Sequence, residues 1–120
     1  PRDYDEILGT ADDFLVLCVD DNVVGCVALH SCSQDVAEVA CLYVKQSHEG
    51  LGYGKALVEA AEERARERGI GSTFVLTTRA VPFFENLGYE AADLAIVPEE
   101  RIRKFEESDR GSKVLSKILG

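Results

Sequence analysis

One stretch of the sequence, residues 37–68, restricts the possible folds more than any other. It begins with an apolar segment from about Ala37 to Val44 that reads as a strand, continues through polar and glycine-rich residues 45–54, and ends in a helical pattern over 55–68. A further apolar strand is predicted over Phe74–Thr78. This order of strand, helix and strand indicates at least one parallel crossover, because the helix carries the chain back to the end of the sheet where the first strand began.

The helical pattern over 55–68 is amphipathic. Small and apolar side chains recur on one face, whereas Glu62 and Arg66 stand four residues apart on another. The apolar face consists of Ala56, Leu57, Ala60, Ala61 and Ala65. Gly69 follows directly and is suited to end the helix, since glycine adopts the left-handed conformation of a helix C-terminus without steric cost. One helix with a single buried face is therefore expected.

Before this unit the chain predicts a pair of strands. Phe14–Val19 reads as a buried strand and Val23–Leu29 as its return, and Asp20–Asn22 supplies the turn of a hairpin. Residues 3–9 look weakly helical, and a second polar turn is expected over Ser31–Asp35. Two strands thus precede the strand–helix–strand unit.

After the unit the predicted elements are short. Residues 80–87 are expected to form a helix, Gly88-Tyr89 a turn into another strand, and residues from Pro98 to about Glu107 a charged helix with proline near its first turn. The tail 114–119 fits helical spacing as well as a final strand. The whole pattern predicts an α/β (α+β) fold built on a mixed sheet.

The length and charge of the chain limit its partners. A chain of 120 residues has the size of one small domain, and 46% apolar residues allow it to bury a core. The 22 acidic and 13 basic residues give a net charge of −9, which repels nucleic-acid backbones and anionic membranes. A small anion is still compatible with this charge, because clustered backbone N–H groups outweigh a distant negative surface. We expect neither nucleic acid nor membrane as a partner, and leave a homodimer open.

The four cysteines, Cys18, Cys26, Cys32 and Cys41, are expected to be reduced. No pair has C-x-x-C spacing, and no His/Cys cluster suits zinc. Three of them stand in apolar runs, where a free cysteine packs as a small hydrophobic residue; a catalytic thiol is the alternative. The sequence shows no secretory signal and no apolar run of membrane-spanning length. These features predict a cytoplasmic protein without a metal site.

The glycine-rich loop Gly50-Leu-Gly52-Tyr-Gly54 predicts an anion site. Glycines let the backbone turn sharply and approach a ligand closely, and the helix that follows supplies free N–H groups and the positive end of its dipole. Two familiar phosphate-binding loops are spaced differently. A P-loop needs Ser or Thr after Gly54-Lys55, where Ala56 stands, and a dinucleotide-binding loop needs G-x-G-x-x-G after the first strand of a βαβ unit.

Residues 38–58 and 80–89 resemble the GNAT superfamily of acetyl-CoA-dependent N-acetyltransferases. The family loop is Q/R-x-x-G-x-G/A, and Glu49-Gly50-Leu51-Gly52-Tyr53-Gly54 matches both glycines, with Glu49 in the position of Gln or Arg. The resemblance implies a mostly antiparallel sheet with a central parallel strand pair and flanking helices. It also implies that acetyl-CoA is the co-substrate and that the loop, with Lys55, holds its pyrophosphate.

Six separated segments resemble, in the same order, the acetyltransferase domain of the N-acetylglutamate synthases. The resemblance implies acetylation of the α-amine of glutamate, at the start of arginine biosynthesis. By the same comparison, residues 1–120 are expected to be a single acetyltransferase domain without the family's first strand, most of its first helix and the amino-acid-kinase-like domain of longer synthases. The segments are Gly25–His30, Glu38–Leu42, Phe74–Arg79, Phe83–Phe84 before Gly88-Tyr89, Val97–Arg101 and Arg110–Leu115.

The resemblance assigns roles to residues on both sides of the loop. Glu38 matches the general base that removes a proton from the ammonium of the acceptor, and a solvated strand-end carboxylate is the alternative. Backbone N–H groups around Leu42, Tyr43 and Val44 are expected to polarise the thioester carbonyl. Many family members protonate the leaving thiolate with a tyrosine, where this chain has Phe84; Thr77, Tyr43 or water are the candidate donors here. Phe83 and Phe84 are expected in the core.

Glutamate carries two carboxylates, so its site needs basic groups. Arg110 and Ser112 match the family's substrate-binding Arg-x-Ser, and a guanidinium suits a carboxylate. Arg2 corresponds to a second such arginine, and His30 to a pocket-lining position, although a structural histidine is the alternative. The charged run 99–109 is expected to be an exposed helix face.

Two other functions stay open at this point. The acidic balance of the chain favours a cationic acceptor, such as a polyamine, an aminoglycoside or a protein lysine, whereas Arg110 favours an anionic one. An acyl-CoA-binding module without turnover is the second alternative, which the departures at Glu49 and Phe84 support.

Overall fold

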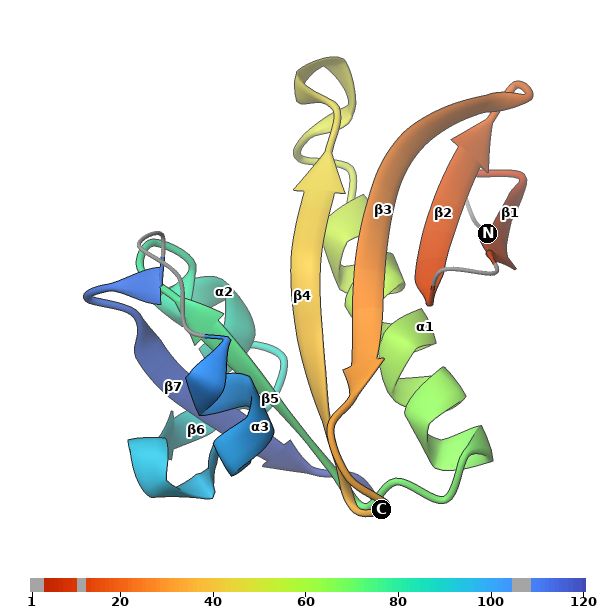
Figure 1. Cartoon of the computed structure of the whole chain (residues 1–120). Helices are drawn as coiled ribbons and strands as arrows, with labels where there is room; N and C mark the ends of the chain where they lie inside the picture. The colour runs from red at the N-terminus through yellow and green to blue at the C-terminus, as the bar shows by residue number, and fades with distance from the viewer. Residues whose placement is uncertain (1–3, 11–12, 105–108) are drawn as a thin grey trace.

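Two antiparallel groups of strands meet at one parallel pair in the centre of the sheet. The computed structural model describes residues 4–10, 13–104 and 109–120. The sheet has seven strands in the order β1-β2-β3-β4-β5-β7-β6, and only β4 and β5 pair in parallel (Figure 1). The strands are β1 Glu6–Gly9, β2 Phe14–Val19, β3 Asn22–Ser31, β4 Val36–Val44, β5 Ser72–Thr77, β6 Glu90–Ala92 and β7 Lys113–Ile118. The mixed sheet with its parallel crossover is confirmed.

The β2–β3 hairpin forms where the sequence predicts it. Its loop is Asp20-Asp21, and both residues have positive φ, 51° and 65°. A two-residue loop with two left-handed positions matches the right-handed twist of the flanking strands, and Asp and Asn tolerate that conformation better than most residues. Strand β3 therefore begins at Asn22, one residue earlier than expected.

The helical prediction for residues 3–9 is wrong. Residues 6–9 form β1, which pairs antiparallel with β2 from Glu6 opposite Cys18 to Gly9 opposite Leu15. Ile7 packs against the core. Four residues carry too little local preference to resist pairing with a neighbouring strand, so the sheet determines their conformation.

The parallel pair is short. It joins Val36 to Ser72, Ala37 to Thr73 and Glu38 to Phe74, and ends there. Beyond it, β4 continues beside β3 and β5 continues beside β7, so the two strands diverge (Figure 1). The side of β4 that follows Glu38 consequently faces an opening rather than a neighbouring strand.

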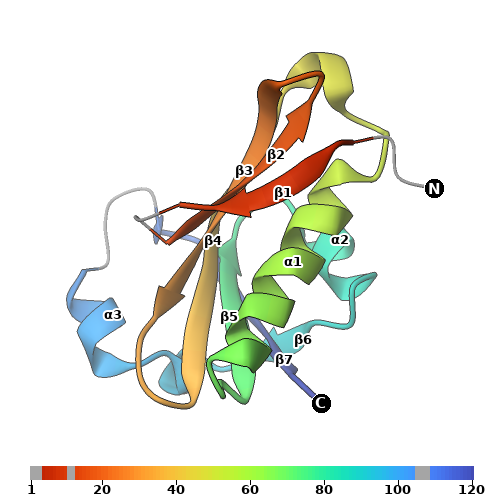
Figure 2. The same cartoon turned by 90° about the vertical axis from the view of Figure 1, so that its right-hand side faces the viewer.

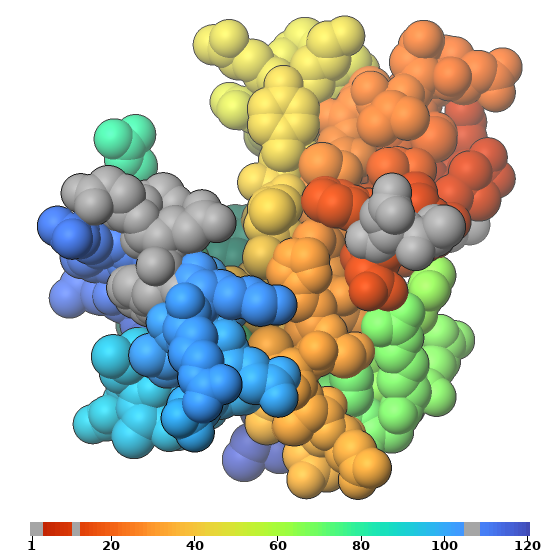
Figure 3. All heavy atoms as spheres, in the orientation of Figure 1, coloured from red at the N-terminus to blue at the C-terminus, as the bar shows by residue number. Residues whose placement is uncertain are grey.

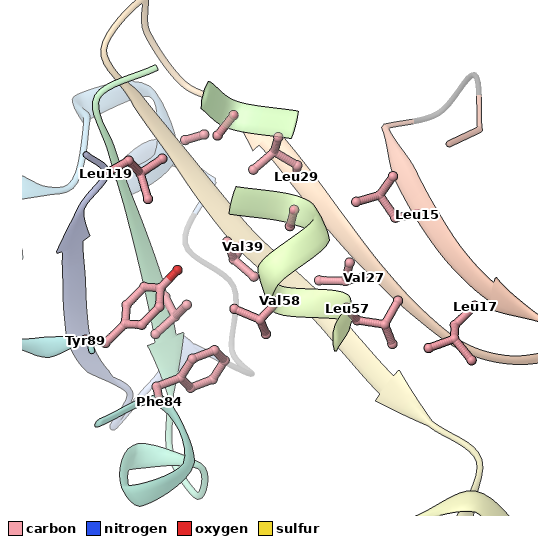
Figure 4. Close-up of a cluster of buried hydrophobic side chains, with 14 of the residues drawn as sticks. Leu15, Leu17, Val27, Leu29, Val39, Leu57, Val58, Phe84, Tyr89 and Leu119 are labelled. Carbon is pink, nitrogen blue, oxygen red and sulfur yellow. The ribbon is translucent and has the colours of Figure 1, made fainter. Parts of the chain in front are cut away.

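Helix α1, Tyr53–Glu67, covers one face of the sheet (Figure 2). Its side chains Leu57, Val58 and Ala61 are fully buried among residues of β2 and β3 that include Leu17 and Val27 (Figure 4). Gly69, with φ 76°, ends the helix as predicted, and the N–H of the next residue donates back to the helix. This packing fixes the start of α1 at the opening between β4 and β5.

The remaining helices are short: η1 Gln46–His48, α2 Val81–Glu85, η2 Leu94–Ile96 and α3 Glu99–Arg103. Pro98 precedes α3 as its N-cap, and the predicted extension to Glu107 runs into residues 105–108, outside the described residues. The ambiguous tail is strand β7, which pairs with both β5 and β6. Within the described residues, no helix has the length and apolar character needed to cross a membrane.

Candidate functional site

The glycine loop places a group of unused N–H donors at the start of α1. Gly50 and Gly52 have φ of 79° and 85°, a conformation that favours glycine, and Gly52 is the N-cap of the helix. A Cβ at either glycine would meet nothing within 4 Å. The N–H groups of residues 50–52, 54 and 55 donate to no described residue, and the first turn holds no acidic side chain. Such an arrangement is suited to bind an anion.

The loop lies against α2. A Cβ on Gly54 would come within 3.3 Å of the Phe83 ring, so glycine allows the start of α1 to approach this helix closely. Phe83 contacts Phe84 edge to face at 5.0 Å, and Phe84 is buried in the main core. The core assignment is confirmed for Phe84, whereas Phe83 is half-buried and packs against that core. The helix begins at Tyr53, two residues before the predicted start, because the glycine conformation permits helical geometry immediately after Gly52.

A β-bulge interrupts β4 just beyond the parallel pair. Cys26 is opposite Tyr43, whereas Ala28 is opposite Ala40, so β4 has one residue more than β3 in this interval. Cys41 takes up the difference with φ 55°. After the bulge, Leu42 and Val44 pack against the core, and Tyr43 is 58% exposed. The backbone of residues 42–44 therefore passes the opening without a partner on the β5 side.

The cysteines are free, but they are less buried than the sequence predicts. Cys18 is buried, Cys26 and Cys32 are half-buried, and Cys41 is exposed because the bulge turns it out of the core. Burial raises the pKa of the Cys32 thiol, and the nearby charge of Glu38 raises it further. A protonated thiol is a poor nucleophile, so Cys32 does not support the catalytic-thiol alternative.

Glu38 is a buried carboxylate with an arginine on both of its oxygens. It is 4% exposed and stands at the last position of the parallel pair. Arg101 donates from Nε to Oε1 at 2.6 Å and from Nη2 to Oε2 at 3.4 Å. The same Nη2 reaches both oxygens of Asp109 at 3.2 Å. Hydrogen bonding to Glu38 raises the pKa of Arg101, although burial opposes the shift.

Sequence reasoning missed Arg101. The run 99–109 is predicted to be an exposed helix face, and this is wrong at Arg101 and Asp109, whose side chains are only 17% and 16% exposed. The prediction fails because residues on a five-residue helix show no periodicity from which the buried side can be inferred. Arg103, two residues on, fits the prediction, since it is 72% exposed and pairs with Glu99 on the surface.

A pocket of about 590 Å³ opens between β4, β5 and α3, and we call it the central pocket. Figure 3 shows the surface hollowed between the C-terminal part and β4. Half of its lining residues are charged, with four carboxylates and two permanent cations among the described residues. His30, on β3, stands opposite Glu38. The charged residues are Asp13, Glu38, Glu100, Asp109, Arg101 and Lys104.

The structure brings together some of the predicted site residues and separates others. Glu38 and His30 share the central pocket, whereas Ser112 lines a second pocket of about 550 Å³ beside α2 and β6. Arg110 is exposed and lines neither of these two pockets. Arg2 lies outside the described residues. Asp109 lines both pockets and so connects the two groups.

Thr77 is the last residue of β5. Its hydroxyl oxygen accepts a hydrogen bond from the N–H of Ala80 at 2.9 Å, in the turn before α2. The hydroxyl can still donate its own proton, so Thr77 both holds this turn and offers a hydrogen-bond donor. Lys55 is exposed in the first turn of α1. In the part of the chain that the structure describes, no group of three or more His, Cys, Asp and Glu residues is arranged to hold a metal ion.

Comparison with known proteins places the chain in a family. The model of the acetyltransferase (GNAT) family matches residues 1–89. The chain belongs to this family. Among its relatives, the amino-acid acetyltransferase of Aeromonas salmonicida is 33% identical over 98% of the chain, and that of Salmonella typhi is 30% identical over 99%. The GNAT chain spans 27% of the length of each of these two relatives.

Solved structures agree with this assignment. N-acetylglutamate synthase from Neisseria gonorrhoeae, complexed with coenzyme A and N-acetyl-glutamate, superimposes with a TM-score of 0.84 at 32% identity, over 90% of this GNAT chain and 26% of that chain. Rv2747 from Mycobacterium tuberculosis, in complex with CoA, gives a TM-score of 0.75 at 26% identity, over 90% of this chain and 76% of that one. The expected resemblance and the expected fold are both confirmed.

Proposed function

We propose that this GNAT chain transfers an acetyl group from acetyl-CoA to the α-amine of an amino acid, with L-glutamate as the acceptor. The observation that carries the proposal is the presence of N–H groups at residues 50–52, 54 and 55 that donate to no described residue, together with a pocket that contains the buried Glu38. The printed names and ligands of the relatives support the amino-acid class and coenzyme A. Their likeness also supports a cytoplasmic role in arginine biosynthesis.

The loop fits the pyrophosphate of acetyl-CoA. Gly50 and Gly52 leave open space where a side chain would stand, and the N–H groups of residues 50–52, 54 and 55 donate to no described residue. Exposed Lys55 adds a positive charge in the first turn of α1, whereas exposed Glu49 is free to turn toward solvent. An anion held at a helix N-terminus gains from both the N–H donors and the helix dipole. The acyl end of the co-substrate then extends along β4 toward Glu38.

Residues around the opening supply what the chemistry needs. Glu38 accepts a proton from the acceptor ammonium, which leaves a neutral amine to attack the thioester carbon. Backbone N–H groups of residues 42–44 donate to the carbonyl oxygen as it gains negative charge. When the carbon–sulfur bond breaks, Thr77 or water donates a proton to the departing thiolate. The donor regains its proton from the nitrogen of the tetrahedral adduct, which loses a second proton as it becomes an amide. The ammonium thereby gives one proton to Glu38 and one to the thiol, and no covalent enzyme intermediate forms.

Basic groups near the pocket are proposed to recognise the acceptor. Arg110 and Ser112 follow directly after Asp109, which lines the central pocket, so a small movement of this segment would bring them to a bound carboxylate. His30 and Lys104 already line the pocket and are complementary to an anion. Arg2 is retained as a second carboxylate ligand from the resemblance alone.

One observation favours a second acceptor class. Four carboxylates face two permanent cations in the central pocket, and this balance attracts a cationic amine such as a polyamine, an aminoglycoside or a protein lysine. Replacing Arg110 with Ala separates the two classes, because it should cripple acetylation of glutamate and leave a cationic acceptor almost unaffected.

The proposal is tested by following the release of free thiol from acetyl-CoA with a panel of amino acids and cationic amines. L-Glutamate should give the highest kcat/KM. A rate with L-glutamate no greater than the rate without an acceptor would remove the substrate assignment. Failure to bind coenzyme A in calorimetry would remove the acetyltransferase assignment as well.

A further inference from the structure

In the structure, Arg101 contacts both oxygens of the carboxylate that is proposed to act as the base. Both carboxylate oxygens accept hydrogen bonds from its guanidinium, and the Glu38 side chain is only 5% exposed. A base needs a lone pair directed at the proton that it removes. Each oxygen keeps a second lone pair, and exchange of the Arg101 contact at Oε2 when the acceptor binds would leave that oxygen without a hydrogen bond from Arg101.

The bonds of Arg101 differ in how readily they can be exchanged. The contact from Nε to Glu38 Oε1 is short, at 2.6 Å, whereas Nη2 is shared between Glu38 Oε2 at 3.4 Å and Asp109 at 3.2 Å. Nη1 donates to the carbonyl of Lys104 at 3.3 Å. The Nη contacts, at 3.2–3.4 Å, are longer than a charge-assisted hydrogen bond of normal strength. The Nη groups are thus the part of Arg101 that another carboxylate can capture.

Arg101 also lies where an acceptor must enter. It lines the central pocket, and its side chain is 17% exposed, so solvent reaches it from the pocket. Asp109, its other partner, is 16% exposed. The titratable and charged groups that share this pocket with Glu38 are Asp13, His30, Cys32, Cys41, Glu100 and Lys104.

We propose that Arg101 is a positioning residue that couples binding of the acceptor carboxylate to release of Glu38. The carboxylate of the incoming amino acid takes the Nη contacts now made to Asp109 and Glu38 Oε2. Arg101 keeps its Nε bond to Oε1, so Glu38 stays oriented, and Oε2 turns to accept the proton of the acceptor ammonium. This inference rests on the proposed acetyl transfer. It deepens that proposal, because an amine without a carboxylate leaves the Arg101 contact to Oε2 in place.

The test compares Arg101→Gln with the unsubstituted protein on two acceptors. The acceptors are the amino acid that turns over fastest and the derivative in which every carboxylate is converted to an amide, which has the same amine but no charged carboxylate. The unsubstituted protein should favour the acid, and Arg101→Gln should reduce this preference in kcat/KM by about 10- to 100-fold, the size of one charge-assisted hydrogen bond. Arg101→Lys should restore part of the preference.

Arg103→Gln is the matched control. It removes an arginine from the same helix, but one that is 72% exposed and paired only with Glu99 on the surface, so it should leave the preference unchanged. Loss of a merely structural ion pair would slow both acceptors equally, and an unchanged preference in Arg101→Gln would therefore overturn the inference. Absence of turnover in the unsubstituted protein would instead overturn the proposed function.

A second measurement covers the case in which Arg101→Gln does not fold. In the unsubstituted protein with coenzyme A bound, the guanidinium resonances of Arg101 are followed by NMR, assigned by their absence in Arg101→Lys. Adding the amino acid should shift the Nη signals and leave the Nε–H signal in place, while the amide should shift neither. Equal responses to the acid and its amide would overturn the inference.

Discussion

Replacing Gly52 with Ala tests the loop most directly, because the helix offers a matched control at its other end. Gly52 and Gly69 flank α1, both have positive φ, 85° and 76°, and a Cβ at either would meet nothing within 4 Å. The left-handed conformation costs a non-glycine residue about 1–2 kcal/mol. Alanine also restricts the unfolded chain, which returns about 0.4–1 kcal/mol. Each variant should therefore lose about 1 kcal/mol of stability, or roughly 3–6 °C in Tm.

The two variants should differ sharply in ligand binding. A methyl group on residue 52 would occupy the open space beside the loop, where the phosphate is proposed to lie, and would hold the phosphate away from the N–H groups. Loss of about two charge-assisted hydrogen bonds, each about 1.5–3 kcal/mol, would weaken coenzyme A binding by roughly 100-fold or more. Gly69→Ala carries the same strain at the end of α1 away from the loop, so its Kd should be unchanged.

The assay is isothermal titration of coenzyme A, alongside thermal melts that verify the matched loss of stability. Binding of coenzyme A that is unchanged in both Gly52→Ala and Gly69→Ala would refute the reasoning that N–H groups of the loop hold the pyrophosphate. Equal weakening in both variants would also refute it, since that result would reflect the helix as a whole.

Three further predictions follow from buried polar groups. Glu38→Gln should lower the rate of acetyl transfer by about 10²- to 10⁴-fold with coenzyme A affinity retained, and a loss of less than about tenfold would argue against a base. Lys117→Met should lower the free energy of unfolding, measured with urea, by about 2–3 kcal/mol, because Glu62, which is 2% exposed, loses its ion pair at 3.1 Å. Adding Glu62→Met to the Lys117→Met chain should recover most of this stability, and no recovery would contradict the contribution of the ion pair. Burial raises the pKa of Tyr89, so as pH rises Tyr89 loses its proton in the unfolded chain before it does so in the folded chain. The free energy of unfolding should therefore fall as pH rises above about 10, the ordinary pKa of tyrosine. Tyr89→Phe should flatten this fall in unfolding measurements, and a fall as steep as that of the unsubstituted protein would contradict the prediction.

The parts of the fold that could be predicted are those with a local pattern. The run Phe14–Val19 is a strand with the predicted bounds, and α1 follows the apolar spacing of its alanines and leucine. Strand β1 could not be predicted, since its conformation comes from pairing with β2 rather than from its own four residues. The tail could not be resolved either, because Val114 and Leu115 suit both a helix and the position that β7 occupies between β5 and β6.

In the candidate site, too, the features that could be predicted are those that are contiguous in the sequence. The glycine loop is contiguous in sequence, so its spacing predicts its position and its N–H donors. The ion pair of Glu38 with Arg101 joins residues that are 63 positions apart, and no local pattern relates them. The outward turn of Cys41 depends on a bulge against β3, which single-strand alternation cannot reveal. The positions of Arg2, Arg110 and Ser112 in an acceptor complex stay predictions from resemblance.

Because β4 and β5 pair over only three residues, both strands have unpaired backbone in the middle of the sheet. An open sheet normally exposes unpaired backbone only along its outermost strands, where extended chains add and where aggregation starts. Here the residues of β4 after Glu38 and those of β5 after Phe74 form a second pair of such edges that face each other. Because these edges face each other, their unpaired backbone groups are placed to pair with an extended molecule that enters between the two strands.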